Sequence, residues 1–267
     1  MRMLIDGHTH IGLPTFLSRP ISAEKLTRPA FQDRMENTVE DLLAKIDANS
    51  IQKAVVFGFP LEEIDHSQAN SYVMEAYHAY PERIIPFALI SDEVKYWLKQ
   101  GIKGFKQQDI LYASQRFDLP RAYSIIAEAG VPMLIHFRAG KGYSVPEQVK
   151  AILKEVPDLK LIIAHMGRHV PNTGQGVEEA LTGLQGFPNV FFETSTVRDS
   201  SVIERAVALI GAERILFGSD FPFNSFQDDD PLAEEISIVE QADISSNSKG
   251  KIFSQNIQQL LGLGEYV

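Results

Sequence analysis

The sequence predicts an α/β protein built as a single (β/α)8 TIM barrel, and three observations lead to this fold class. Eight short apolar runs alternate with segments of helical spacing along the 267 residues. Most of these runs start one strand–helix unit apart. The runs are continuous rather than alternating, as is typical of strands that are buried on both faces of a parallel sheet.

Each apolar run is predicted to be one strand of the barrel. The runs cover residues 3–8, 54–58, 84–90, 102–106, 132–136, 160–165, 189–193 and 214–220. An open, doubly wound sheet is the alternative. That fold normally carries a glycine-rich dinucleotide loop, and neither G-x-G-x-x-G nor G-x-x-x-x-G-K-[ST] occurs in the sequence.

The segments between the strands have the spacing and the end residues of helices. They cover residues 39–49, 68–80, 92–100, 120–130, 146–156, 177–184, 200–211, 231–241 and 249–261. Proline favours a helix start, and glycine favours the left-handed conformation that follows a helix end. Such residues are Pro120, Pro146, Pro231, Gly101, Gly130 and Gly211.

One barrel domain is expected over residues 1–267, with C-terminal helices over residues 231–262 and a long loop after the first strand over residues 11–37. The loop contains Pro14, Pro20, Pro29, Phe16, Phe31, Arg19, Arg28 and Arg34. Because βα loops lie at the C-terminal mouth of a barrel, we predict a lid that sets substrate choice. A packed surface excursion is the alternative.

Composition excludes several classes of function. The chain has 25 Lys+Arg and 35 Asp+Glu, and this net charge of −10 argues against nucleic acid as a partner. No apolar run approaches the ~18 residues of a membrane span, and no signal-peptide pattern is present. The absence of cysteine excludes disulfides and thiolate chemistry. We expect a cytoplasmic protein that acts on a small molecule; a homo-oligomer is compatible with the sequence.

Histidines gather at the predicted carboxyl ends of the strands. His8 and His10 lie two positions apart at the end of the first strand, so both imidazoles face one side. His136 ends the fifth strand, His165 the sixth and Asp220 the eighth. A barrel brings these strand ends to one mouth. Imidazole nitrogen with carboxylate oxygen suits Zn²⁺, with Mn²⁺ or Fe²⁺ as alternatives, so a metal centre is predicted.

These residues lie in the motifs Ile5-Asp-Gly-His-Thr-His10, Pro132-Met-Leu-Ile-His136, Ile162-Ile-Ala-His-Met-Gly167 and Ile215-Leu-Phe-Gly-Ser-Asp-Phe-Pro222. The series resembles the amidohydrolase superfamily, in particular its amidohydrolase-2 branch of enzymes similar to aminocarboxymuconate semialdehyde decarboxylase. The resemblance extends from residue 3 to about residue 222. It implies one divalent metal held by His8, His10, His136 and Asp220, with His165 as the catalytic histidine.

Other basic residues follow the predicted strand ends and are candidates for binding an anionic substrate group. They are Lys106, Arg138, Lys141, Arg168 and His169. Lys106 also stands where some members of the superfamily carry a carboxylated lysine that bridges two metal ions. Pairing of Lys106 with a nearby carboxylate is the plain structural alternative.

The favoured function is a metal-dependent hydrolase that acts on a small ester, lactone or amide. Asp220 would take the proton of a metal-activated water, and His165 would polarise the carbonyl group. The alternative is a non-oxidative decarboxylase of an aromatic or unsaturated carboxylic acid that uses the same metal site. A nuclease similar to the TatD family also begins with H-x-H, but it has glutamate where this chain has Lys106. A barrel that binds a ligand without chemistry is the fourth hypothesis.

Overall fold

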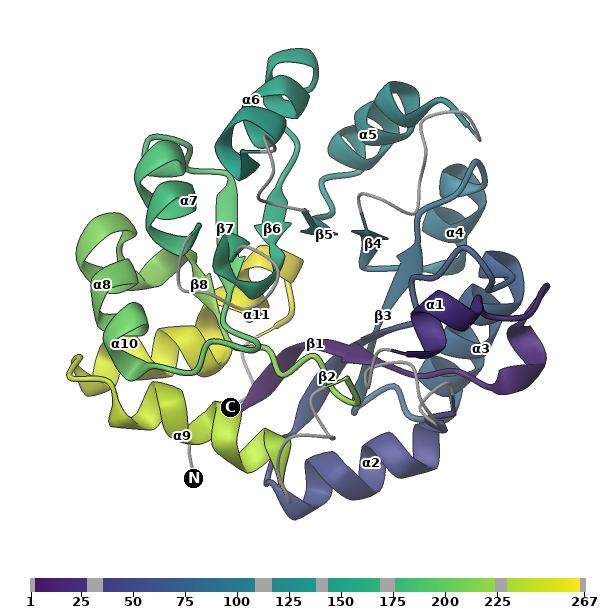
Figure 1. Ribbon diagram of the computed structural model, residues 1–267, viewed down its shortest axis with the longest axis horizontal. Coiled ribbons are helices and arrows are strands. Elements are labelled where there is room, and N and C mark those ends of the chain that lie inside the picture. Colours follow the sequence, from purple (N-terminus) through teal and green to yellow (C-terminus); the bar gives the residue numbers. More distant parts are fainter. Residues whose placement is uncertain are drawn as a thin grey trace.

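Eight strands form one parallel sheet in their order along the chain (Figure 1). The computed structural model describes residues 3–27, 36–108, 117–137, 144–168, 176–223 and 230–264. The strands are β1 Ile5–His10, β2 Lys53–Phe57, β3 Ile84–Leu89, β4 Gly104–Gln108, β5 Met133–His136, β6 Leu161–Ile163, β7 Val190–Glu193 and β8 Ile215–Leu216. Each strand pairs in parallel with the next. The predicted (β/α)8 barrel is confirmed.

Backbone hydrogen bonds between β1 and the chain after β8 close the barrel. The amide of Gly7 donates to the carbonyl of Phe217 at 2.8 Å, and the amide of Asp220 donates to the carbonyl of His8 at 2.8 Å. This approach requires glycine, because a Cβ atom at position 7 would lie 2.8 Å from the Phe217 carbonyl oxygen. The closure therefore places Asp220 directly beside His8.

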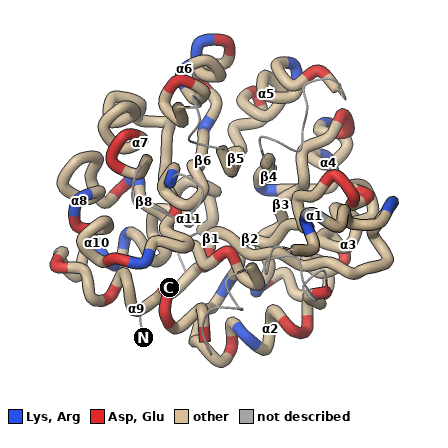
Figure 2. The backbone as a smooth tube through the Cα atoms, viewed as in Figure 1, with Lys and Arg blue, Asp and Glu red and all other residues tan. Residues whose placement is uncertain are grey.

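Helices surround the strands (Figure 1), and most Lys, Arg, Asp and Glu residues lie on the helices and loops (Figure 2). The helices are α1 Ala23–Leu26, α2 Val39–Ala48, α3 His66–Ala79, α4 Val94–Gln100, α5 Leu119–Glu128, α6 Val145–Glu155, α7 Val177–Leu184, α8 Ser200–Ile210, α9 Pro231–Gln241, α10 Ser246–Gly250 and α11 Asn256–Leu261. Short turns are η1 Pro14–Phe16, η4 Ala164–Gly167, η5 Ala212–Arg214 and the π-helical η6 Lys251–Gln255. Within the described residues, none of the helices has the length and apolarity that a bilayer span needs.

Several of the helices begin at side chains that cap them. Thr38 and Asp41 form a capping box at the start of α2, and the carboxylates of Asp65 and Asp118 accept backbone N–H groups at the starts of α3 and α5. Each such cap contributes about 1 kcal/mol because it satisfies an amide that has no partner within the helix.

Two apolar layers explain the continuous apolar runs of the sequence. Val55 and Phe57 of β2 belong to the cluster inside the barrel, whereas Ala54 and Val56 belong to the layer between the sheet and the helices. Adjacent side chains of a strand point to opposite faces, so both faces must be apolar.

Several predicted boundaries are wrong. β6 ends at Ile163 and β8 ends at Leu216, so His165 and Asp220 do not end strands but lie in the loops that follow. His165 has φ 54° and Asp220 has φ 61°, conformations that a strand cannot contain. The predicted helix over 249–261 comprises α10, η6 and α11.

The loop predicted as a lid is described over residues 11–27 and 36–37. Arg28, Pro29, Phe31 and Arg34 lie outside the described residues. The described part packs against the segment between β2 and α3, where the amide of Ser18 donates to the carbonyl of Glu63 at 2.7 Å. Arg19 pairs with Glu62 at 2.7 Å. The role of this loop as a lid stays a prediction.

We predict that Gly104→Ala destabilises the barrel by about 1–3 kcal/mol, because a Cβ atom at position 104 would overlap the ring of the buried Phe87. Urea unfolding followed by circular dichroism measures this change. Gly186→Ala is the matched control, because a Cβ atom there has nothing within 4 Å. Equal stability of the two variants would contradict the proposed packing at position 104.

Candidate metal centre

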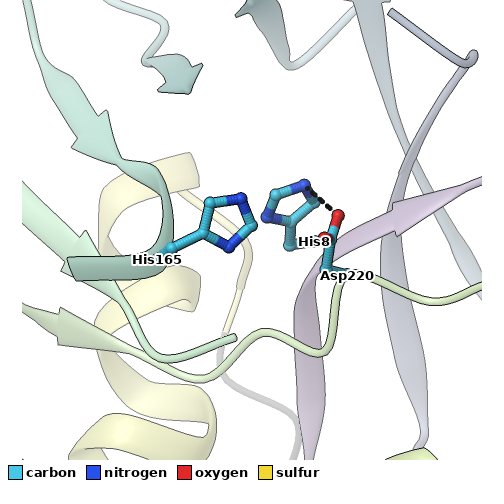
Figure 3. A group of neighbouring side chains, drawn as sticks. All are labelled: His8, His165 and Asp220. Carbon is cyan, nitrogen blue, oxygen red and sulfur yellow. Dashed lines mark ion pairs between the residues drawn. The ribbon is translucent and has the colours of Figure 1, made fainter. Parts of the chain in front are cut away.

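The candidate site lies at the carboxyl ends of the strands, where His8, His165 and Asp220 face one another (Figure 3). His8 belongs to β1, and His165 and Asp220 belong to the loops after β6 and β8. One donor atom from each of the three side chains lies within 4.8 Å of the others, a spacing that one metal ion can bridge. The barrel thus brings together residues that are far apart in the sequence.

Asp220 contacts both histidines of the H-x-H motif. The Nε2 atoms of His8 and His10 each lie 3.0 Å from Oδ1 of Asp220. On the opposite side of the rings, Nδ1 of His8 lies 2.9 Å from Oε1 of Glu193, and Nδ1 of His10 lies 3.1 Å from the carbonyl oxygen of Gly58. Every ring nitrogen of the pair therefore has a polar neighbour.

The two remaining predicted histidines are in direct contact. Nε2 of His165 lies 3.0 Å from Nδ1 of His136, and Nδ1 of His165 lies 2.8 Å from Oγ of Ser195. All five residues of the predicted constellation therefore meet at one site. Which of the five hold a metal and which do acid–base work stays a prediction at this point.

Glu193, at the end of β7, is a buried residue of the site that sequence reasoning missed. Its carboxylate accepts hydrogen bonds from the amide of His165 at 2.6 Å, the amide of Ser195 at 2.7 Å and Oγ of Ser195 at 2.9 Å, besides the contact with His8. The available signal was an acidic residue that closes an apolar strand at the same level as the histidines.

Asp6 holds the backbone beneath the site. Its Oδ1 atom accepts from the amides of His8 and Ser219, each at 3.0 Å. The side chain is fully buried, and this burial raises the pKa of Asp6 to about 7 despite its hydrogen bonds to Ser219 and His8. Asp6 therefore joins β1 to the loop that carries Asp220.

Two of the predicted basic candidates lie at the site. Lys106 is 1% exposed, and its Nζ atom lies 3.2 Å from Nε2 of His8. Arg168 donates from Nε to Oγ1 of Thr196 at 2.7 Å. The same Thr196 atom lies 3.4 Å from Nδ1 of His165. Arg138, Lys141 and His169 lie outside the described residues.

Burial and neighbouring charges set the protonation of the site. Burial lowers the pKa of His10 to about 4, although Asp220 opposes the shift. Burial and, to a smaller extent, Arg168 lower the pKa of His165 to about 3, although Asp220 opposes the shift. Burial raises the pKa of Asp220, but His8, His10 and His165 together hold it well below its usual value. The site at neutral pH therefore contains neutral His10 and His165 rings beside an ionised carboxylate.

The pKa values of the remaining buried groups are shifted by the same two causes, burial and neighbouring charges. Burial lowers the pKa of Lys106 to about 8, although Asp220 and Glu193 oppose this. Burial raises the pKa of Glu193, but His8 and His165 outweigh it and bring the pKa to about 2. Burial and Lys106 lower the pKa of His8, yet Glu193 and Asp220 leave it raised overall. The carboxylates are therefore ionised, and they offset the positive charge at Lys106.

The model of the amidohydrolase family matches residues 5–263. The chain belongs to this family. The motifs indicated the amidohydrolase-2 branch, and this prediction is confirmed. The prediction that the protein is an enzyme of the amidohydrolase superfamily is confirmed with it. The match covers every strand of the barrel and all five residues of the predicted constellation.

Solved structures share the fold at low sequence identity. A 5-carboxyvanillate decarboxylase from Sphingomonas paucimobilis superposes with a TM-score of 0.73 at 16% identity, over 99% of this chain and 100% of that chain. A probable 2-pyrone-4,6-dicarboxylic acid hydrolase from Acinetobacter baumannii has a TM-score of 0.72 at 17% identity, over 97% and 99%. A dihydroxybenzoic acid decarboxylase from Polaromonas sp. JS666, with bound manganese and the inhibitor 2-nitroresorcinol, has a TM-score of 0.69 at 18% identity, over 100% and 98%.

We predict that Asp6→Ala lowers the free energy of unfolding by roughly 2–5 kcal/mol, because two buried amides lose their acceptor at about 1–3 kcal/mol each. Urea unfolding measures the change. Asp158→Ala, at an exposed position, is the control and is expected to stay within about 0.5 kcal/mol of the parent protein. A loss of less than about 1 kcal/mol in Asp6→Ala would contradict the role of Asp6.

Proposed function

We propose that this protein holds one divalent metal ion with His8, His10 and Asp220 among its ligands. The observation that carries the proposal is the 3.0 Å approach of both Nε2 atoms to Oδ1 of Asp220. Nδ1 of His10 faces the carbonyl oxygen of Gly58, which can only accept, so this neutral ring carries its hydrogen on Nδ1 and leaves Nε2 as a lone pair. Lone pairs that face a carboxylate oxygen repel it unless a cation lies between them.

His136 or His165 completes the set of ligands. The resemblance to the amidohydrolase-2 branch assigns the fourth place to His136 and keeps His165 for acid–base work. Among the described residues, however, the group of donor atoms within 4.8 Å of one another contains His165. The two rings touch, so the variants of each residue are the direct means of separating the roles.

The donor set suits more than one ion. Three imidazoles and a carboxylate accommodate Zn²⁺, as predicted from the sequence, and Mn²⁺ as well. The structurally similar decarboxylase from Polaromonas contains manganese, so we propose Mn²⁺ as the first ion to test and Zn²⁺ as the second.

The substrate that we propose is a small cyclic, unsaturated carboxylic acid. Two basic side chains, the buried Lys106 and the half-buried Arg168, accompany the candidate ligands and favour an anionic group. The three similar structures are all of enzymes named for cyclic carboxylic acids. The reaction that we propose is non-oxidative decarboxylation, which two of those three names describe.

Decarboxylation breaks the bond between the ring carbon and the carboxyl group. The electron pair of this bond stays on the ring carbon, and carbon dioxide leaves. The ring carbon then takes up a proton that comes from water, and His165 or Asp220 would relay it as the acid–base group of the site. A bound divalent ion contributes Lewis-acid stabilisation of negative charge on substrate oxygen. Lys106 and Arg168 orient the anionic substrate and exclude neutral analogues.

Hydrolysis is the second candidate, and the carboxylate of Asp220 favours it. This group is ionised and lies among the candidate ligands, so it would accept the proton of a water that a bound metal activates. The probable 2-pyrone-4,6-dicarboxylic acid hydrolase has the same fold. The hydrolysed bond would then be an ester, lactone or amide of a similar acid.

We predict that the purified protein binds about one equivalent of Mn²⁺ or Zn²⁺, because the ligands converge on one point. Elemental analysis after metal reconstitution measures the content, and His8→Asn or Asp220→Asn is expected to abolish stable binding. His78→Asn, on the exposed side of α3, is the control. Loss of metal in His136→Asn but not in His165→Asn assigns the ligand to His136, and the reverse assigns it to His165. A metal-free protein with no measurable affinity would contradict the proposed centre.

We predict that the Mn²⁺-loaded protein releases carbon dioxide from a member of a panel of hydroxybenzoic and carboxyvanillic acids. Asp220→Asn and His165→Asn are expected to lower kcat by about 10²–10⁴-fold or more, the range for loss of an acid–base group. A coupled assay of carbon dioxide measures the rate, and ring opening of a pyrone dicarboxylic acid is measured in parallel. Ring opening without release of carbon dioxide would contradict the proposed decarboxylation and show that the protein is a hydrolase.

A further inference from the structure

The carboxylate of Glu193 contacts two histidines of the site, one in β1 and one in the loop after β6. Oε1 of Glu193 lies 2.9 Å from Nδ1 of His8 and 2.9 Å from Oγ of Ser195. Oγ of Ser195 in turn lies 2.8 Å from Nδ1 of His165. Glu193 therefore contacts His8 directly and reaches His165 through one hydroxyl group.

The directions of these hydrogen bonds follow from groups that can only donate. The amides of His165 and Ser195 donate to Oε1 and Oε2 of Glu193, so both carboxylate oxygens act as acceptors. The hydroxyl hydrogen of Ser195 points to Oε1, and Oγ is then an acceptor toward His165. The hydrogen of the His165 ring must lie on Nδ1, as must that of His8.

We propose that Glu193 is a positioning residue that fixes the Nδ1–H tautomer of both His8 and His165, with Ser195 as the link to His165. Both rings then present a bare Nε2 atom to the centre of the site. For His8 this atom faces Asp220, and for His165 it faces His136. In the neutral rings these tautomers are set before any metal binds, so the Nδ1–H groups need no rearrangement on binding.

The arrangement has a consequence for the choice of residue at position 193. A glutamine has the same shape, but its amide nitrogen donates hydrogen bonds and would face a backbone amide or a ring N–H group. The fully buried position leaves no water to relieve that conflict. The proposal deepens the metal centre proposed above, but the tautomers themselves can be observed without metal.

The test is long-range ¹H–¹⁵N correlation spectroscopy of the metal-free protein labelled with ¹⁵N-histidine, with signals assigned through His8→Asn and His165→Asn. At a pH above the titration of His8, where both rings are neutral, we expect the Nδ1–H form for both residues in the parent protein. Glu193→Gln is expected to populate the Nε2–H form and to weaken Mn²⁺ binding, measured as Kd by calorimetry, about 10–100-fold. Ser195→Ala is expected to change the His165 signals and to leave those of His8 in place.

Glu235→Gln is the matched control, because Glu235 is a second buried carboxylate that accepts the amide of Thr196 at 2.9 Å in the same loop. It is expected to preserve both tautomers. An Nε2–H form of either histidine in the parent protein, or unchanged tautomers in a folded Glu193→Gln, would overturn the proposal. If Glu193→Gln does not fold, an unchanged His165 tautomer in Ser195→Ala overturns it. Correct tautomers without metal affinity would refute the proposed metal centre and leave the role of Glu193 intact.

Discussion

The pairing of β1 with the chain after β8 is the constraint on which the site depends. The carbonyl of His8 accepts the amide of Asp220, and the amide of His10 donates to the carbonyl of Phe221, each at 2.8 Å. These bonds belong to the closure of the barrel, so the fold itself sets the distance between the H-x-H pair and Asp220. A loop held only by its side chains would not position a carboxylate with this precision.

Closure alone would leave charged groups buried without compensation, and the network around Glu193 and Asp6 supplies it. Lys106 is buried beside His8, and its Nζ atom lies 5.1 Å from the centroid of the Phe57 ring. Isolated charges in such surroundings cost several kcal/mol. The carboxylates of Glu193 and Asp220 oppose the charge of Lys106, and backbone amides donate to both oxygens of Glu193 and to Oδ1 of Asp6. The contacts that stabilise the buried charges are therefore the same contacts that hold the candidate metal ligands in place.

The sequence was sufficient for the fold because the pattern of the strands is set by burial alone. Phe57 and Val56 contact different apolar layers, and that is visible as an uninterrupted apolar run. The H-x-H pair was predictable for a related reason, since a strand turns positions 8 and 10 to the same side. The positions of His136, His165 and Asp220 after apolar runs predicted that they meet at the mouth of the barrel, and the family motifs implied their roles. The strand ends assigned to His165 and Asp220 were wrong.

The role of Glu193 could not be predicted in this way. An acidic residue at a strand end is compatible with solvent, with a helix cap or with a buried network, and only the register of β7 against β6 decides among them. The contact of Lys106 with His8 likewise depends on the curvature of the barrel, which brings β4 across to β1. Patterns within one segment carry no information about such cross-barrel distances.

Left-handed backbone conformations gather in the loops that carry the site. Among the described residues, the non-glycine residues with positive φ are Ser50, His165, Met166, Thr196 and Asp220. Four of these five lie in the loops after β6, β7 and β8. Each such conformation costs on the order of 1–3 kcal/mol and persists only where its surroundings enforce it. The amide of His165 is held by Glu193, that of Thr196 by Glu235 and that of Asp220 by His8. The strain therefore concentrates where side chains must turn back toward the centre of the barrel, and hydrogen bonds to buried groups maintain it. A strand that continued in extended form would direct Asp220 along the barrel wall, away from the imidazoles that it now contacts.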